Sequence, residues 1–201
     1  MTNPNYDYLA IVADRSGSMK AIREEAEGAL KGVVTEQRKL PGELTVNLFT
    51  FDDKFEEVPE GDIDTWTLQP RGMTALYDAI GKSMTIVGER LAAMPEDQRP
   101  GKVMFVIVTD GMENCSREWR LDTVRNLVTE QQDRYGWQVI FTAANLDAHA
   151  VGTSLGLRKD QNMNFAYSGV GAASAGNQIL QSVSNYRSGA TRSMNVPQDA
   201  S

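Results

Sequence analysis

Two short apolar runs, each ending abruptly in an aspartate, constrain the fold of this chain more than any other feature. Residues 8–13 read Tyr-Leu-Ala-Ile-Val-Ala and stop at Asp14, and residues 102–109 read Lys-Val-Met-Phe-Val-Ile-Val-Thr and stop at Asp110. Apolar runs without polar alternation are typical of strands buried on both faces of a parallel sheet. Because ligands of such sheets bind beyond the carboxyl ends of the strands, we expect both aspartates at one ligand-binding edge.

The rest of the chain alternates between strand and helix patterns. Further strands are expected at residues 44–51, 55–58, 138–143 and 163–166, and helices at 19–40, 75–94, 121–134, 148–155 and 172–187. Strands separated by helices predict an α/β fold, a doubly wound and mostly parallel central sheet flanked by helices. The hairpin pattern at 44–58 adds one short antiparallel edge strand. Ser18 is expected to cap the first helix.

Length and composition suit one domain with a short tail. The chain has 201 residues, 41% hydrophobic and 23% charged, so we expect a single domain over residues 1–187 and a polar, flexible tail over 188–201. A net charge of −7 argues against non-specific nucleic-acid binding. Cys115 is the single cysteine, which excludes an internal disulfide and a thiolate metal cage. With no signal-peptide or membrane-span pattern, a cytoplasmic location is expected.

Hard oxygen ligands gather at the expected sheet edge. Asp14, Ser16 and Ser18 lie in one turn after the first strand, Thr74 follows a glycine-containing loop, and Asp110 follows a second strand. Carboxylate and hydroxyl oxygens suit Mg²⁺, or Mn²⁺, rather than soft metals. Two acidic residues would balance the charge of the ion and leave a coordination position open. Such a position would attract an external carboxylate.

The order Asp14-x-Ser16-x-Ser18, Thr74, Asp110-Gly111 resembles the metal-ion-dependent adhesion site of von Willebrand factor A domains. The resemblance covers residues 6–155 and extends more loosely to 187, and it includes small standalone members of bacteria and bacteriophages. It implies that both serines and Thr74 bind the ion directly, while the aspartates largely orient waters and hydroxyls. It also implies that an Asp or Glu of a protein partner completes the coordination. The family usually has two glycines before the threonine, whereas this chain has Gly72-Met73.

The sequence lacks the residues and motifs that other functions would require. A serine hydrolase needs a base, but His149 is the sole histidine, lies in an expected short helix and is interpreted as structural. The phosphate-binding loop of nucleotide hydrolases is absent. Two alternatives to a metal-dependent protein-binding module stay open: a structural module with a vestigial site, and a magnesium-dependent phosphohydrolase with Asp14 as nucleophile. We therefore expect a binding module with no catalytic residues.

Three further acidic residues are given local structural roles. Asp52 and Asp53 are expected to be turn residues of the hairpin. Asp78 is expected to favour the first turn of its helix through the helix dipole. None of the three is predicted to contribute to a site.

Overall fold

The structure is a computed structural model and describes residues 1–196. Its strands are β1 (Asn3–Asp14), β2 (Glu43–Phe51), β3 (Phe55–Val58), β4 (Pro100–Thr109), β5 (Gln138–Ala143) and β6 (Asn162–Asn164). Its α-helices are α1 (Arg23–Arg38), α2 (Leu76–Ala93), α3 (Leu121–Tyr135), α4 (Ala148–Ser154) and α5 (Gly169–Arg187), and its 3₁₀ helices are η1 (Gly17–Ile22), η2 (Glu60–Asp62), η3 (Glu96–Gln98) and η4 (Lys159–Gln161).

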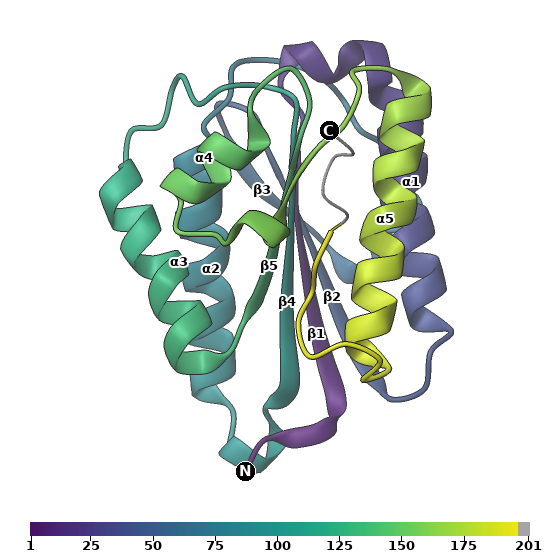
Figure 1. The fold of residues 1–201 in the computed structure, drawn as a ribbon, viewed down its shortest axis with the longest axis vertical. Coiled ribbons are helices and arrows are strands. Elements are labelled where there is room, and N and C mark those ends of the chain that lie inside the picture. Colours follow the sequence, from purple (N-terminus) through teal and green to yellow (C-terminus); the bar gives the residue numbers. More distant parts are fainter. Residues whose placement is uncertain (197–201) are drawn as a thin grey trace.

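The six strands form one sheet in the order β3-β2-β1-β4-β5-β6. Neighbouring strands are parallel except for β3, which pairs antiparallel with β2 at one edge. Helices α1 and α5 cover one face of the sheet, and α2, α3 and α4 cover the other (Figure 1). The predicted doubly wound α/β fold with one antiparallel edge strand is confirmed.

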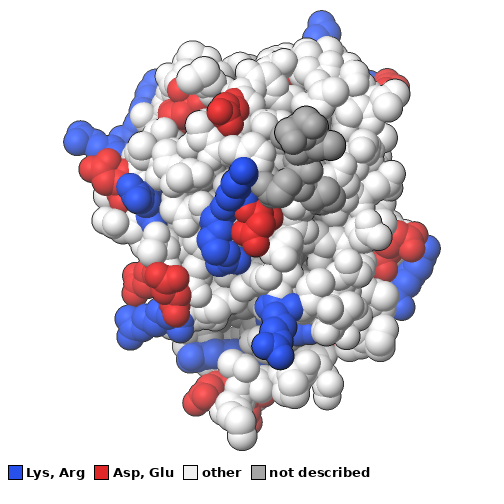
Figure 2. Space-filling model, in the orientation of Figure 1, with Lys and Arg blue, Asp and Glu red and all other residues white. Residues whose placement is uncertain are grey.

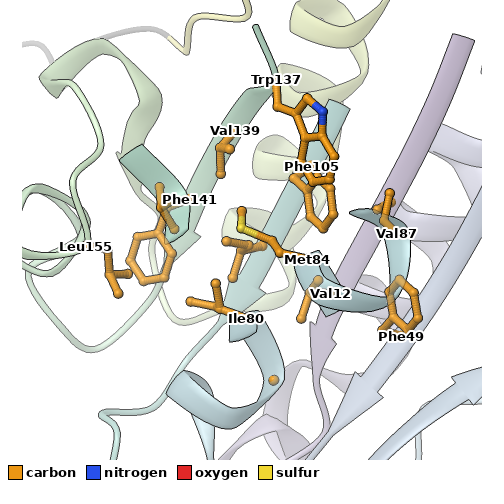
Figure 3. Packing of buried hydrophobic residues seen from close by; sticks show 14 of the residues in the cluster. Val12, Phe49, Ile80, Met84, Val87, Phe105, Trp137, Val139, Phe141 and Leu155 are labelled. Atoms are coloured by element: carbon orange, nitrogen blue, oxygen red, sulfur yellow. The ribbon is translucent and has the colours of Figure 1, made fainter. Parts of the chain in front are cut away.

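The apolar residues of β1 supply both cores. Tyr8, Ala10 and Val12 pack toward α2 and α3, whereas Leu9 and Ile11 pack toward α1 and α5. Figure 3 shows the first of these cores, in which Phe105 stacks on Trp137 with ring centroids 5.2 Å apart. Because every residue of β1 from Leu9 to Ala13 is at most 1% exposed, the strand shows no polar alternation.

The chain leaves β1 and β4 in opposite directions across the sheet. β1 is followed by α1, on one face, and leads to β2, whereas β4 is followed by α3, on the other face, and leads to β5. The strand order therefore reverses between two neighbouring parallel strands. In open α/β sheets this reversal opens a crevice beyond the carboxyl ends of the strands, where ligands bind.

The expected start of the first helix was wrong. Ser18 lies inside η1, and α1 begins only at Arg23. In a 3₁₀ helix, side chains three positions apart lie on the same face. Met19 and Ile22 of η1 therefore share one buried face, which packs against Leu68 and Ala172. The hydroxyl of Ser18 is thereby available for a contact with Asp110, directly after β4, instead of capping a helix.

Two apolar side chains of the expected flexible tail, residues 188–201, are buried in the core. Met194 is fully buried and Val196 is 4% exposed, and both join the core beneath α5. Met194 N donates to Gln138 Oε1, and Val196 N donates to Asp160 O. The polar composition of the segment concealed two apolar contacts. Residues 197–201 of the expected tail lie outside the described residues.

The surface carries charges of both signs. On the face seen in Figure 2, acidic and basic side chains are interspersed, and a wide uncharged area covers α5, whose only charged residue is Arg187. No helix within residues 1–196 is long and apolar enough to cross a membrane. The expected cytoplasmic location stays a prediction.

Candidate functional site

Asp14 lies at the end of β1 and is fully buried. Its Oδ1 accepts a hydrogen bond from Ser16 N at 2.6 Å, and its Oδ2 accepts one from Thr109 Oγ1 at 2.5 Å. The first bond closes the tight turn that brings Ser16 back over the strand end, and the second ties the turn to β4. Asp14 therefore fixes the relative position of both strand ends.

Two serines connect this turn to the second aspartate. Ser16 Oγ and Ser18 Oγ are 3.1 Å apart, and Ser18 Oγ donates to Asp110 Oδ1 at 2.6 Å. Asp110 is 2% exposed, and its other oxygen, Oδ2, is buried without a hydrogen-bond partner. Leaving a buried carboxylate oxygen unpaired is costly, so this atom calls for a positively charged or hydrogen-bonding group.

The third segment of the site is the loop that ends at Thr74. Thr74 is 3% exposed, and its backbone is held on both sides: Thr74 N donates to Asn114 Oδ1 at 2.9 Å, and Asn114 N donates to Thr74 O at 3.0 Å. Gly17 N also donates to Gly72 O at 3.3 Å. The three site loops are thus bonded to one another.

Gly111 marks the point where the hydroxyls meet. A methyl group placed on Gly111 would lie 2.9 Å from Thr74 Oγ1, 3.6 Å from Ser18 Oγ and 3.7 Å from Ser16 Oγ. Three hydroxyls from two separate loops of the chain therefore converge beside Gly111, close enough that an added methyl group would press against Thr74 Oγ1. The structure brings together all five residues that the sequence singled out.

The two carboxyl groups are poorly solvated. Burial raises the pKa of Asp14 to about 6. Hydrogen bonds from Thr109 and Ser16 lower this pKa, and the nearby charge of Asp110 raises it. Burial also raises the pKa of Asp110. Desolvated acids of like charge are unfavourable in the ionised form, and a divalent cation between them would reverse that preference.

An ion-pair network beside the site, in which Arg15 and Asp52 are buried and Arg71 and Glu56 are half-exposed, was missed by sequence reasoning. Arg15 Nε and Arg71 Nε both donate to Asp52 Oδ2, at 3.0 and 2.7 Å. Glu56 accepts from both arginines as well. The backbone O of Asp52 accepts from Ala75 N at 2.9 Å. Asp52 also closes the hairpin turn as expected, through Lys54 N, but its full burial shows the larger role of joining the Ser16 and Thr74 loops.

The role expected of Asp78 was incomplete. Its carboxylate accepts three backbone hydrogen bonds, from Arg117, Glu118 and Trp119, at 2.8 to 3.0 Å. Asp78 therefore fixes the segment that follows Asn114. Neither this contact nor that between Asn114 and Thr74 has a local signal, because the partners are about forty residues apart in sequence.

The donor atoms of the site suit a hard divalent cation. Three hydroxyls, two carboxylates and no sulfur or imidazole are the ligand types that Mg²⁺ and Mn²⁺ prefer. The hydroxyls that converge beside Gly111 and the unpaired Asp110 Oδ2 are compatible with an ion at this point. Within residues 1–196, no three Asp, Glu, His or Cys side chains are grouped so as to hold a metal by themselves. The hydroxyls would therefore be required to hold a metal ion at this site.

Protein-family models and curated proteins give no match to this sequence. Solved structures with the same fold include proximal thread matrix protein 1 from the mussel byssus with a zinc-occupied MIDAS motif, a metal-ion-dependent adhesion site (TM-score 0.65, 16% identity, 88% of this chain and 45% of that one). A von Willebrand factor type A protein from Catenulispora acidiphila has a TM-score of 0.61 and 11% identity, and the match covers 88% of this chain and 42% of that one. The vWF domain of the pilus tip protein Mfa5 from Porphyromonas gingivalis has a TM-score of 0.61 and 10% identity, and the match covers 89% of this chain and 95% of that one.

These likenesses define a class of fold. The chain has the fold of a von Willebrand factor A domain, over 88–89% of its length in each comparison. It spans less than half of the length of the mussel and Catenulispora proteins. At 10–16% identity the comparisons concern the fold alone, so the chemistry of the site rests on its own residues.

Proposed function

We propose that this chain is a protein-binding module that holds Mg²⁺ or Mn²⁺ at the candidate site and captures an acidic residue of a partner through the ion. Ser16, Ser18 and Thr74 would bind the cation directly, and Asp14 and Asp110 would balance its charge and orient its waters. A bound cation supplies a Lewis-acidic position that attracts a carboxylate. In this proposal the chain is not an enzyme.

One observation carries the proposal: three hydroxyls converge beside Gly111, next to a buried, unpaired oxygen of Asp110. In a vestigial site, we would expect this oxygen to be paired within the protein, and it is not. The mussel protein with a zinc-occupied MIDAS motif shares the fold, which supports the same location for an ion here.

The phosphohydrolase alternative has less support. A nucleophilic carboxylate must reach its substrate, whereas Asp14 is fully buried and both of its oxygens accept hydrogen bonds. The arrangement fits a positioning role for Asp14.

Calorimetric titration of metal-stripped protein with Mg²⁺ and Mn²⁺ tests the proposal. The parent should bind one ion, and Asp110→Asn should bind at least about tenfold more weakly, because outer carboxylates typically contribute that much to metal affinity. Asp133→Asn, which removes an exposed aspartate of α3, is the matched control and should bind like the parent. Absence of binding by the parent would instead support the vestigial, structural alternative.

A further inference from the structure

Exposed apolar side chains gather around the candidate metal site. Met73 precedes Thr74 and is 52% exposed, and Met112 follows Gly111 and is 69% exposed. Tyr167 is 38% exposed and donates its hydroxyl to the backbone O of Ser18. We call Met73, Met112 and Tyr167 the apolar rim. Among the other described residues, the large apolar side chains with comparable exposure are Met1, Tyr135 and Val170.

The apolar rim comes from three separate segments. Met73 belongs to the loop before α2, Met112 to the loop after β4, and Tyr167 to the loop before α5. Three distant parts of the sequence thus each place one large apolar side chain beside the site: Met73 adjoins Thr74, Met112 adjoins Gly111, and Tyr167 contacts Ser18. Exposed apolar groups that cluster rather than scatter mark interaction surfaces, because water contact with them is unfavourable.

A hollow of about 380 Å³ adjoins the apolar rim at Met73. Phe51, Phe55, Met73 and Ala75 line it together with Cys115 and charged side chains of both signs. Met73 precedes Thr74, and Cys115 follows Asn114, which is bonded to Thr74. Two residues that line the hollow are therefore joined to the Thr74 loop of the candidate metal site, and the hollow offers room for a side chain of a bound segment next to Met73.

We propose that the candidate metal site is the centre of a docking surface for a protein segment whose acidic residue is flanked by apolar side chains, with the apolar rim and the adjoining hollow as their contacts. This inference rests on the proposed function. The cation would select the acidic residue by charge, and the apolar rim would select its neighbours. Contacts that dominate the affinity of protein interfaces are typically shielded from water by surrounding residues, and the apolar rim would shield the carboxylate–metal contact in this way.

Three blocked pentapeptides test the proposal. Acetyl-Gly-Leu-Glu-Leu-Gly-amide, its Ser-Glu-Ser analogue and its Leu-Gln-Leu analogue contain at most one carboxylate, because both termini are blocked. Their affinities are measured by NMR titration of magnesium-loaded protein. The Leu-Glu-Leu peptide should bind at least about tenfold tighter than the Ser-Glu-Ser peptide, from partial burial of two leucines. The Leu-Gln-Leu peptide should lose most of the binding.

A double variant, Met73→Ser with Met112→Ser, should remove most of the advantage of the Leu-Glu-Leu peptide and leave Mg²⁺ affinity unchanged. Tyr135→Ser is the matched control, since Tyr135 is 55% exposed at the far end of α3, and it should preserve the advantage. Exposed substitutions of this kind leave folding nearly unaffected.

The outcomes separate this inference from the proposed function. Normal Mg²⁺ binding with equal affinity for the Leu-Glu-Leu and Ser-Glu-Ser peptides would overturn the docking surface and leave the metal site intact. Absence of Mg²⁺ binding would overturn both. Sedimentation of the magnesium-loaded protein should show a monomer. A magnesium-dependent dimer that the double variant abolishes would assign the surface to a second copy of this chain and overturn the proposal.

Discussion

Gly111 lies where the three hydroxyls of the candidate site meet, and the absence of a side chain at this position lets them approach one another. The nearest atom to an added methyl group would be Thr74 Oγ1, at 2.9 Å, followed by two serine hydroxyls. No backbone atom is among these neighbours, and Gly111 does not have a positive φ. A side chain at this position would therefore disturb the site and not the fold.

Gly111→Ala is expected to weaken Mg²⁺ binding at least about tenfold, the scale seen when groups around a metal are disturbed. Its melting temperature should stay near that of the parent. Calorimetric titration and thermal unfolding measure the two effects. Gly28→Ala is the control: it lies in α1 with nothing within 4 Å of an added methyl, and it should stabilise the helix by about 0.5–1 kcal/mol without changing metal affinity. Unchanged metal affinity in Gly111→Ala would contradict the assigned location of the ion.

The β2–β3 hairpin holds the loops of the site through charge. Asp52, at its turn, and Glu56, in β3, accept hydrogen bonds from Arg15 and Arg71. Arg15 belongs to the loop after β1, and Arg71 precedes Gly72 in the loop before α2. Arg71 N also donates to Arg15 O at 2.8 Å. An edge hairpin outside the site thus sets the distance between two of its three loops.

The pairing of Glu56 predicts a pH-dependent contribution to stability. The Arg15 guanidinium lowers the pKa of Glu56 from 4.5 to about 2. Because the folded-state pKa is depressed, the contribution is fully present above about pH 4.5 and is lost as the pH falls toward 2. Denaturant midpoints of the parent and Glu56→Gln should therefore differ at neutral pH and converge near pH 2.

The control for this series is Glu130→Gln, which removes an exposed i,i+4 pair with Arg134 in α3. Its midpoint should lie close to that of the parent throughout, since exposed pairs of this kind contribute little. A difference between the parent and Glu56→Gln that stays constant down to pH 2 would refute the pairing.

The segment after α5 completes the core on one side of the sheet. Met194 and Val196 fill the core that α1 and α5 form with the sheet, and backbone bonds tie the segment to β5 and η4. Arg187, at the end of α5, adds a buried pair with Asp7 in β1, with Nε 2.7 Å from Oδ2. The C-terminal part of the described chain therefore belongs to the folded unit.

Met194→Ala is expected to lower the free energy of unfolding by about 2 kcal/mol or more, because truncating a buried methionine leaves a cavity. Chemical denaturation measures the change. Met112→Ala, at a site that is 69% exposed, should change it by less than about 0.5 kcal/mol. Equal effects of the two substitutions would show that residues 188–196 contribute nothing to the core.

Much of the architecture could be predicted because its signals are local. The apolar runs before Asp14 and Asp110 lie in the buried strands β1 and β4, and the interval 138–143 coincides with β5. The resemblance supplied Thr74, whose place beside Gly111 no periodicity could indicate. The start of α1 was predicted wrongly and the packing of Met194 was not predicted, because each depends on an apolar contact with a distant segment.

The sequence by itself determined the order of strands and helices and the oxygen-rich character of the site, since apolar patterning and side-chain chemistry are read along the chain. Tertiary structure alone decided that Ser18 bonds to Asp110, that Asp52 joins two loops, and that Met73, Met112 and Tyr167 are exposed beside residues of the site. The physical reason is that these contacts join residues tens of positions apart, and only the reversal of strand order between β1 and β4 brings them to one edge of the sheet.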